Sequence, residues 1–276
     1  MVSSDSRKVG FRDRAMSVFS SRPYSTHFVE RLGETGLQGV SILDIGCGVQ
    51  MQDLRNLAQL GAGRCVGVDI RQVSCEIDLD ERLEFLHVDV DEENLPFVDC
   101  SFDMVFIHDV IEHLHHPLRA LEEIRRVIRP DGCVSIITPN QAALKNRVKL
   151  ALGGSIYFPL KKWVGENDYV DKQGHRVFTG HIREYTMAEL IDMVEMAGFE
   201  VVSTTFYPAA FKSGRDNKEN KYCKADSITR LSESRVLFSL YHLAEVLVPS
   251  WGYMISLVGA KRVHGLGNDV ARSLDK

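Results

Sequence analysis

The sequence lacks several features that would define a protein class at once. None of its six cysteines forms a CxxC pair, so neither a zinc site nor a disulfide framework is indicated. Repeats and low-complexity segments are absent as well. Neither sign of charge is in large excess, since the formal net charge is −5, and we expect no general nucleic-acid binding. We therefore expect a cytoplasmic protein with reduced thiols.

Long apolar runs are missing too. The most apolar helix that we expect, residues 236–248, is short and is followed by Pro249, so a membrane span is not indicated. A chain of 276 residues that is 44% hydrophobic can bury one sizeable core. We expect a single domain over residues 1–276, with an N-terminal helical segment at 1–38. The basic residues and serines of that segment suit a transit peptide, whereas its two aspartates favour an amphipathic helix.

Near-continuous apolar runs, separated by helical patterns, dominate what is present. Such runs are typical of parallel strands that are covered by helices on both faces. The sequence thus predicts an α/β, Rossmann-like, doubly wound sheet. Its first five strands are expected near residues 40–45, 64–69, 84–88, 103–108 and 132–138.

Three helices are expected between and after these strands. One spans about 51–60. A second begins at Pro117, buries a stripe of apolar residues and ends at 130–132. A third begins at a capping box formed by Thr186 and Glu189 and stops at Gly198. The stripe of the second helix consists of Leu118, Leu121, Ile124 and Ile128.

The stretch ILDIGCG, residues 42–48, couples a buried strand to Asp44 and to two glycines, Gly46 and Gly48. Glycines allow bare backbone to approach a ligand, and the helix that follows points its amide groups into the same crevice. A dinucleotide fingerprint would need its third glycine at Met51, which disfavours NAD. Ligands bind at the carboxyl ends of parallel strands, so four side chains should converge there: Asp44, Asp69, Asp89 and His108.

An acid two residues before the first glycine resembles the pattern of class I S-adenosylmethionine-dependent methyltransferases. The resemblance covers residues 38–140 and, less strongly, 181–207. It includes CVGVDI (65–70), LEFLHVDV (83–90), the stretch 95–114 and RPDGCVSIITPN (129–140). It implies a mostly parallel sheet of seven strands, in which FEVVSTTFY forms the sixth and YMISLVGAKR the antiparallel last. It also implies S-adenosyl-L-methionine as the cofactor.

The resemblance assigns roles to the acids of this crevice. Asp44 would reach the methionine end and Asp69 the ribose, whose two hydroxyls suit the two oxygens of a carboxylate. Asp89 would hold the adenine, with Asp91 as the alternative. The full set implied is Asp44, Gly46, Cys47, Gly48, Asp69, Ile70, Asp89, Val90 and His108. Gln50 departs from the pattern, because the family has its third glycine there.

Methyl transfer is an in-line displacement that depends on placement, and a hydroxyl acceptor gains from a base. If a helix begins near Asp109, then Asp109, Glu112 and His113 share one face. This resembles the ExxEH arrangement of metal-assisted O-methyltransferases of ubiquinone and small-RNA pathways. Mg²⁺ or another divalent metal would then bind Asp109, Glu112, His113 and His181. Two alternatives stay open: catalysis by His113 or His181 as an unassisted base, and catalysis by placement alone.

We expect an enzyme that methylates a hydroxyl oxygen of a small molecule, glycan or lipid-linked intermediate. A cofactor-binding but catalytically idle regulatory subunit is the alternative, because Gln50 could crowd the methionine moiety. Two insertions, 141–180 and 208–250, would form a substrate lid or an interface. The basic and apolar stretch 141–162 would contact an anionic membrane peripherally or form an ordinary solvated helix. The second insertion would pack on the fold or support a homodimer.

Overall fold

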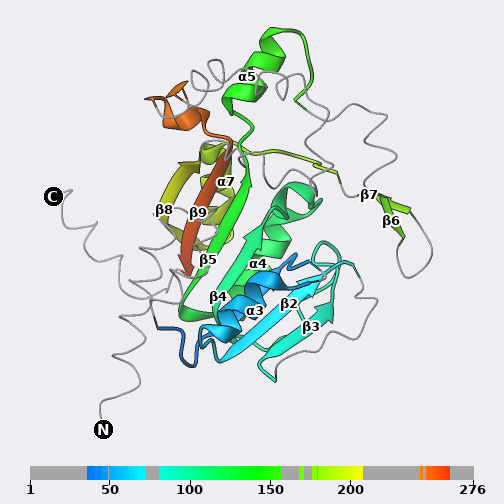
Figure 1. Cartoon of the computed structure of the whole chain (residues 1–276), viewed down its shortest axis with the longest axis vertical. Coiled ribbons are helices and arrows are strands. Elements are labelled where there is room, and N and C mark those ends of the chain that lie inside the picture. The colour runs from blue at the N-terminus through cyan, green and yellow to red at the C-terminus, as the bar shows by residue number, and fades with distance from the viewer. Residues whose placement is uncertain are drawn as a thin grey trace, which may run out of the picture.

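A twisted sheet of seven strands forms the centre of the protein (Figure 1). The computed structural model describes residues 36–48, 50–71, 81–156, 168–170, 176–178, 180–207, 243–244 and 247–261. The strand order is β3-β2-β1-β4-β5-β9-β8. The strands are β1 (Ser41–Ile45), β2 (Arg64–Asp69), β3 (Leu83–His87), β4 (Phe102–His108), β5 (Ile128–Pro139), β8 (Phe199–Tyr207) and β9 (Met254–Lys261).

The direction of the strands confirms the predicted topology. Strands β1 to β5 pair in parallel, and β9 runs antiparallel to both of its neighbours, β5 and β8. The carboxyl ends of the five parallel strands therefore lie at one edge of the sheet. A separate two-stranded sheet, β6 (Asp168–Val170) and β7 (Arg176–Phe178), lies within the first insertion and was not predicted.

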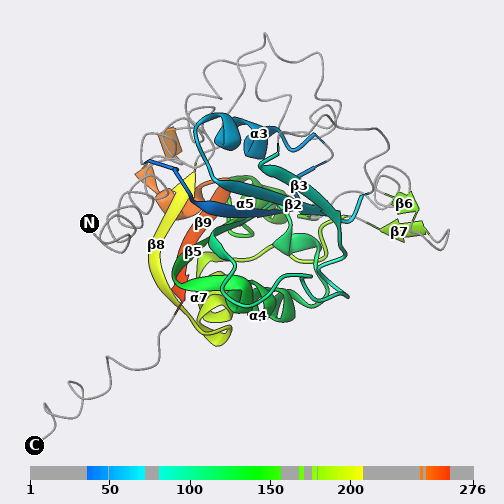
Figure 2. The same cartoon turned by 90° about the horizontal axis from the view of Figure 1, so that it is seen from below.

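Helices cover both faces of the sheet, as the apolar strands require. Helix α3 (Gln52–Gln59) lies on one face, and α4 (Pro117–Val127) and α7 (Met187–Met196) lie on the other (Figure 2). Each face has its own apolar core: Leu54 and Leu57 of α3 pack in one, and Leu121, Ile124 and Leu190 pack in the other. This two-sided burial confirms the doubly wound architecture.

The predicted end of the second helix was wrong. Helix α4 begins at Pro117 as expected but ends at Val127, and Ile128 is already extended. The predicted end, 130–132, lies inside β5. Ile128 pairs with Phe102 of β4, and the register then shifts before the next pair, Met104 with Cys133. Early strand pairing thus ends the helix. Its buried stripe is Ala120, Leu121, Ile124 and Val127.

The capping box of the third helix is confirmed. The side chain of Thr186 accepts a hydrogen bond from the amide of Glu189, and the Glu189 carboxylate accepts one from the amide of Thr186 at 2.9 Å. Gly198 follows the last turn of this helix with φ of 84°, a conformation that favours glycine.

Several predicted segments fall largely outside the described residues. They are most of the N-terminal segment 1–38 and large parts of the insertions 141–180 and 208–250. The first insertion contributes helix α5 (Leu144–Ala151), and the second contributes the short helix η4 (Pro249–Trp251). Among the described residues, the longest apolar helices fall short of what crossing a membrane requires.

Candidate functional site

The glycine loop after β1 is pinned to β2 by backbone hydrogen bonds. The amides of Gly46 and Cys47 both donate to the carbonyl oxygen of Val68, at 2.8 and 3.3 Å. Gly46 has φ of 75°, and a Cβ built on it would lie 2.3 Å from Cγ2 of Val110. A Cβ on Gly48 (φ 65°) would meet no atom within 4 Å. The loop therefore packs against the segment after β4 at Gly46 and borders open space at Gly48.

Asp69 connects this loop to the end of β2. Its carboxylate is buried and accepts hydrogen bonds from the amide of Gly48 (2.9 Å) and the amide of Arg71 (2.8 Å). The Arg71 guanidinium also donates to it at 3.3 Å. The sequence predicted Asp69 at this edge but missed its bonds to Gly48 and Arg71. Its role toward a ribose stays a prediction.

Three acidic side chains, Asp44, Asp53 and Asp69, influence one another near the loop. Burial, and then the nearby Asp53 and Asp69, raise the pKa of Asp44 to about 8. Burial and the same acidic surroundings raise the pKa of the Cys47 thiol, so this cysteine stays protonated. The sequence reasoning missed Asp53, which lies in the first turn of α3 and reads from sequence as an ordinary helix-start acid. A cationic ligand group, such as the methionine ammonium of S-adenosylmethionine, would favour the ionised form of Asp44 and would be held by it.

The raised pKa of Asp44 predicts a trade-off between stability and binding at this residue. A carboxyl group whose pKa is raised by folding binds a proton more readily in the folded state, so stability falls as pH rises from about 4 to about 8. Asp44→Asn removes this penalty, so we expect a higher melting temperature for the free protein at pH 7.5. We also expect at least tenfold weaker binding of S-adenosylmethionine, because a charge-assisted hydrogen bond is lost. Differential scanning fluorimetry and calorimetry measure the two effects, and a lower melting temperature would contradict the assignment.

The loop after β3 contains two acids with different surroundings. Asp91 accepts hydrogen bonds from the amides of His115 (2.8 Å) and His116 (2.7 Å) and from the His115 ring (2.8 Å). Asp91 therefore ties this loop to the start of α4. Asp89 accepts the amide of Asp91 at 3.0 Å, and burial is the main cause that raises its pKa. Ile70 and Val90 are half-buried after β2 and β3.

His108 ends β4, but its ring faces the neighbouring strand. Its Nε2 lies 2.9 Å from Oγ of Ser135 on β5, and burial lowers the pKa of His108 to about 3. The ring is therefore neutral at physiological pH. Any contact that His108 makes with a cofactor would come from its backbone, because the side chain is engaged in the sheet.

The predicted helix from Asp109 was wrong. Asp109 has φ of 54°, in the left-handed region, and its amide donates to the carbonyl oxygen of Ile137 on β5 at 2.9 Å. Only a short 3₁₀ helix, η1 (Ile111–His113), follows before α4. Asp109, Glu112 and His113 therefore do not share a helical face, because pairing with β5 continues through Asp109.

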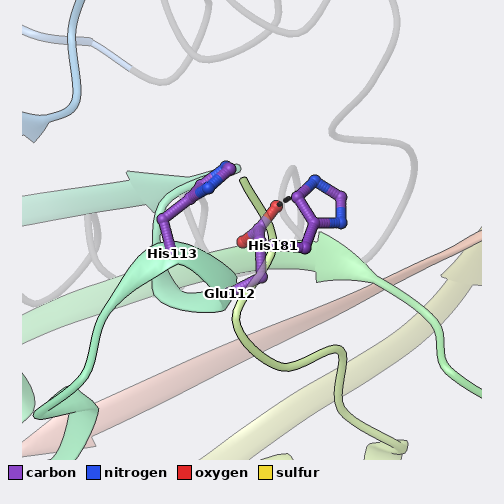
Figure 3. Close-up of side chains that lie close together, drawn as sticks. All are labelled: Glu112, His113 and His181. Carbon is purple, nitrogen blue, oxygen red and sulfur yellow. Dashed lines mark ion pairs between the residues drawn. The ribbon is translucent and has the colours of Figure 1, made fainter. Parts of the chain in front are cut away.

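Glu112, His113 and His181 nevertheless come together (Figure 3), and Asp109 is not part of the group. One potential ligand atom from each of the three lies within 4.8 Å of the others. The carbonyl oxygen of Glu112 accepts the amides of Ile182 (2.8 Å) and Arg183 (3.2 Å), which brings His181 to this place. The rings of His113 and His181 meet edge to face, with centroids 4.9 Å apart.

Glu112 is the most enclosed member of this group. Its side chain is fully buried, and Oε2 accepts the hydroxyl of Thr138 at 2.9 Å. Oε1 lies 4.0 Å from Nε2 of His181 and has no hydrogen-bond partner among the described residues. Burial, and then Asp109, raise the pKa of Glu112 to about 7. Glu112 can therefore gain or lose a proton near neutral pH.

A second carboxylate holds the other side of His181. Nδ1 of His181 lies 3.2 Å from Oε1 of Glu184, whose Oε2 accepts the side-chain amide of Asn146 at 2.9 Å. Burial works to lower the pKa of His181, but the hydrogen bond that its ring donates to Glu184 and the charge of Glu112 raise the pKa overall. Burial works to raise the pKa of Glu184, but His181 and Lys145 lower it overall. Glu184 is thus ionised beside a readily protonated imidazole.

Sequence reasoning missed three members of this network: Thr138, Asn146 and Glu184. Glu184 follows His181 by three residues in HIREYT, and that spacing could have indicated a pair. The sequence around Asn146 gave no indication of its role, because its partner Glu184 lies 38 residues further along the chain. Thr138 lies at the end of β5, where its carboxyl-end position could have suggested a role.

The strand order and the glycine loop define the class I methyltransferase fold. The chain matches the model of a methyltransferase domain family over residues 12–204. It belongs to this family, and with it to the class I S-adenosylmethionine-dependent methyltransferase superfamily.

Curated relatives agree with this assignment. The chain is 30% identical over 175 residues to a probable S-adenosylmethionine-dependent methyltransferase of Mycolicibacterium smegmatis, covering 60% of this chain and 54% of that protein. It is 29% identical to the mitochondrial ubiquinone biosynthesis O-methyltransferase of Dictyostelium discoideum, covering 44% and 42%. A ubiquinone/menaquinone biosynthesis C-methyltransferase of Cupriavidus necator is 32% identical, covering 41% and 45%. The chain thus spans about half the length of these relatives.

Solved structures share the fold at low sequence identity. One is a chain from the complex of the Haloferax volcanii Trm112 methyltransferase activator with a methyltransferase, with a TM-score of 0.52 and 20% identity, covering 94% of this chain and 95% of that chain. Another is the YcgJ protein of Bacillus subtilis, with a TM-score of 0.51 and 18% identity, covering 87% and 100%. At this identity the likeness concerns the fold alone.

Proposed function

We propose that the protein transfers the methyl group of S-adenosylmethionine to a hydroxyl oxygen, with His181 as the proton acceptor. The observation that carries the proposal is the orientation of His181 between two carboxylates. Glu184 at 3.2 Å accepts from Nδ1, so the lone pair of the neutral ring is on Nε2. Nε2 faces Glu112 at 4.0 Å. This is the arrangement of an oriented general base.

S-adenosylmethionine, when bound, supplies the methyl group as an electrophile. The glycine loop and the acids around Asp44 would hold its methionine end, and Asp69 and Asp89 would hold its nucleoside. His181 takes the proton of the acceptor hydroxyl at Nε2 while the oxygen bonds to the methyl carbon and the carbon–sulfur electron pair stays on sulfur. Glu112 and Glu184 stabilise the imidazolium that forms. Asp109 and His113 border the acceptor without taking the proton.

The packing of the two loops supports transfer between these places. Gly46 of the cofactor loop lies against Val110, two residues before Glu112. The loop that would hold the methyl donor and the group that would hold the acceptor are therefore neighbours. In-line transfer needs an acceptor within about 3 Å of the methyl carbon, which requires such closeness.

For the acceptor we propose a small molecule, a glycan or a lipid-linked intermediate. Relatives named for quinone biosynthesis methylate at oxygen in one case and at carbon in another. A half-buried, oriented base beside the site supports oxygen, because a hydroxyl must lose its proton to accept the methyl group. The segment 141–156 continues directly from β5 and borders the acceptor side through Asn146 and Glu184.

A metal-assisted version of the same reaction is the second candidate. The observations that favour it are the three closely spaced ligand atoms and the buried Oε1 of Glu112, which has no hydrogen-bond partner in the described part of the chain. Glu112, His113 and His181 offer one oxygen and two nitrogen donors, which would suit Mn²⁺, Fe²⁺ or Zn²⁺ better than Mg²⁺. Asp109, the fourth ligand that the sequence suggested, is outside the group. The metal would lower the pKa of the acceptor hydroxyl.

One experiment tests the reaction and separates its two versions. The protein is incubated with isotope-labelled S-adenosylmethionine and an extract of its source organism, with and without EDTA. We expect labelled product, identified by mass spectrometry, at equal rates in both samples. If labelling is lost in EDTA and recovers when Mg²⁺ or Mn²⁺ is added, the metal-assisted version is favoured over the unassisted base. Label on carbon or nitrogen in the product would contradict the hydroxyl acceptor.

A further inference from the structure

Helix α5 ends in a turn whose apolar side chains are exposed. Val148, Leu150 and Leu152 are 37%, 58% and 82% exposed. Of the eight residues of α5, Asn146 alone is buried. Figure 1 shows α5 beyond the carboxyl end of β5, standing away from the sheet. The helix is therefore fixed at its base and presents leucines at its tip.

The charged residues of helix α5 are all basic. Helix α5 carries Lys145, Arg147 and Lys149, and no acidic residue occurs in the sequence from 141 to 165. Arg147 is exposed beside Val148. A helix that combines exposed apolar side chains with basic residues is complementary to an anionic, apolar partner.

A second segment brings exposed leucines to the same end of the molecule. Leu243 and Leu247 are 50% and 70% exposed. The chain just after Leu247 is fixed to the base of α5, because the side-chain amide of Asn140 donates to the carbonyl oxygens of Ser250 (3.1 Å) and Gly252 (2.7 Å). Lys145 also lies over the ring of Tyr253 at 3.8 Å. We call the exposed residues Arg147, Val148, Leu150, Leu152 and Leu247 the docking tip.

We propose that the docking tip inserts into the surface of an anionic lipid bilayer. At about 100° per residue, Leu150 lies about 200° around the helix from Val148, so apolar side chains point to different sides of one turn. A folded partner would have to surround that turn, whereas lipid headgroups and acyl chains deform around it. Basic side chains beside it meet the lipid phosphates. The binding does not depend on the proposed reaction.

The consequence for the substrate rests on the proposed function. The tip continues from β5 at the end of the sheet that carries Glu112 and His181, and Asn146 joins its base to Glu184. Docking would therefore bring the acceptor side of the site to the membrane surface. Among the proposed acceptors, this favours the lipid-linked class.

Co-sedimentation of the full chain with vesicles tests the docking. We expect binding to vesicles of phosphatidylcholine with phosphatidylglycerol, weaker binding to phosphatidylcholine alone, and release by salt. Arg147→Gln with Lys149→Gln should weaken binding roughly fivefold per residue. Leu150→Ser with Leu152→Ser should weaken it by about tenfold or more per leucine. Methyl transfer to a water-soluble acceptor should be unchanged in the leucine variant, which separates docking from the reaction.

Matched controls make the result specific. Val98 and Met196 are 79% and 72% exposed and lie outside the docking tip. Val98→Ser with Met196→Ser removes the same number of apolar side chains and should bind as the unmodified protein does. Unfolding monitored by circular dichroism checks that each variant is folded. The proposal would be overturned if the leucine variant bound vesicles fully or if the unmodified protein bound none. It would also be overturned if the protein formed a dimer that the leucine variant dissociates, because the tip would then contact a second copy of the chain.

Discussion

Asp69→Ala is expected to abolish binding of S-adenosylmethionine and methyl transfer together. The variant removes the carboxylate that the family pattern places on the ribose and also the acceptor that holds the amide of Gly48 at 2.9 Å. Hydrogen bonds to a charged group contribute roughly 1.5–3 kcal/mol each, so losing two ribose contacts weakens binding about 10²- to 10⁴-fold. Titration calorimetry with S-adenosylmethionine measures the loss directly.

Two further variants separate the ligand contact from the loop anchor. Asp69→Asn keeps the shape of the side chain and one carbonyl acceptor, so the fold should persist while binding is still lost. Asp99→Ala is the matched control, because Asp99 is 74% exposed in its ion pair with Arg126 and precedes β4, at the other edge of the sheet. Unchanged binding in both Asp69 variants would remove this residue from the cofactor site. Weak or absent binding by the unmodified protein would instead support a catalytically idle subunit.

The cofactor side of this site was predictable because its residues follow directly from strands. Asp44, Gly48 and Asp69 lie within three residues of the ends of apolar strands, and parallel strands carry such ends to one edge. The number of strands and the antiparallel last strand came from the family resemblance. The end of α4 was missed because Ile128 already pairs with β4, so the helix ends before the proline, aspartate and glycine at 130–132 that were expected to stop it.

The acceptor side was predictable only in its residue types. Glu112, His113 and His181 were singled out, but the reason was a helix that does not form, since Asp109 continues the pairing with β5. His181 reaches the group because the Glu112 carbonyl binds the amides that follow it, a contact across 70 residues of chain. Tertiary hydrogen bonds of this kind leave no periodicity in the sequence. The contact of Asn146 with Glu184 could not be predicted for the same reason.

His181→Asn is expected to lower kcat by about 10²- to 10⁴-fold, the usual contribution of a positioned base. KM for S-adenosylmethionine should be nearly unchanged, because the groups proposed to hold this molecule are on β1, β2 and the loop after β3. Steady-state kinetics with saturating acceptor measures both constants. A variant that loses cofactor binding along with kcat would point to a structural role instead.

Glu184→Gln tests the base through its partner without touching the acceptor. His181 accepts a proton only in its neutral form, so the rate rises with pH through the pKa of this imidazole. Glu184 raises that pKa, so its removal should move the acid limb of the pH–rate profile to lower pH. The plateau of kcat should fall by about tenfold to 10²-fold, because a weaker and less oriented base remains.

Glu195→Gln, an exposed substitution of the same type on α7, should change neither the acid limb nor the plateau. Asn146→Ala should shift the acid limb in the opposite direction, because it removes the donor that binds Oε2 of Glu184 at 2.9 Å and so makes this carboxylate more basic toward His181. Opposite shifts in the two variants would be hard to obtain from loss of packing alone. An acid limb that stays at the same pH in both would assign the proton to another group, with Glu112 as the next candidate because its pKa is raised to about 7.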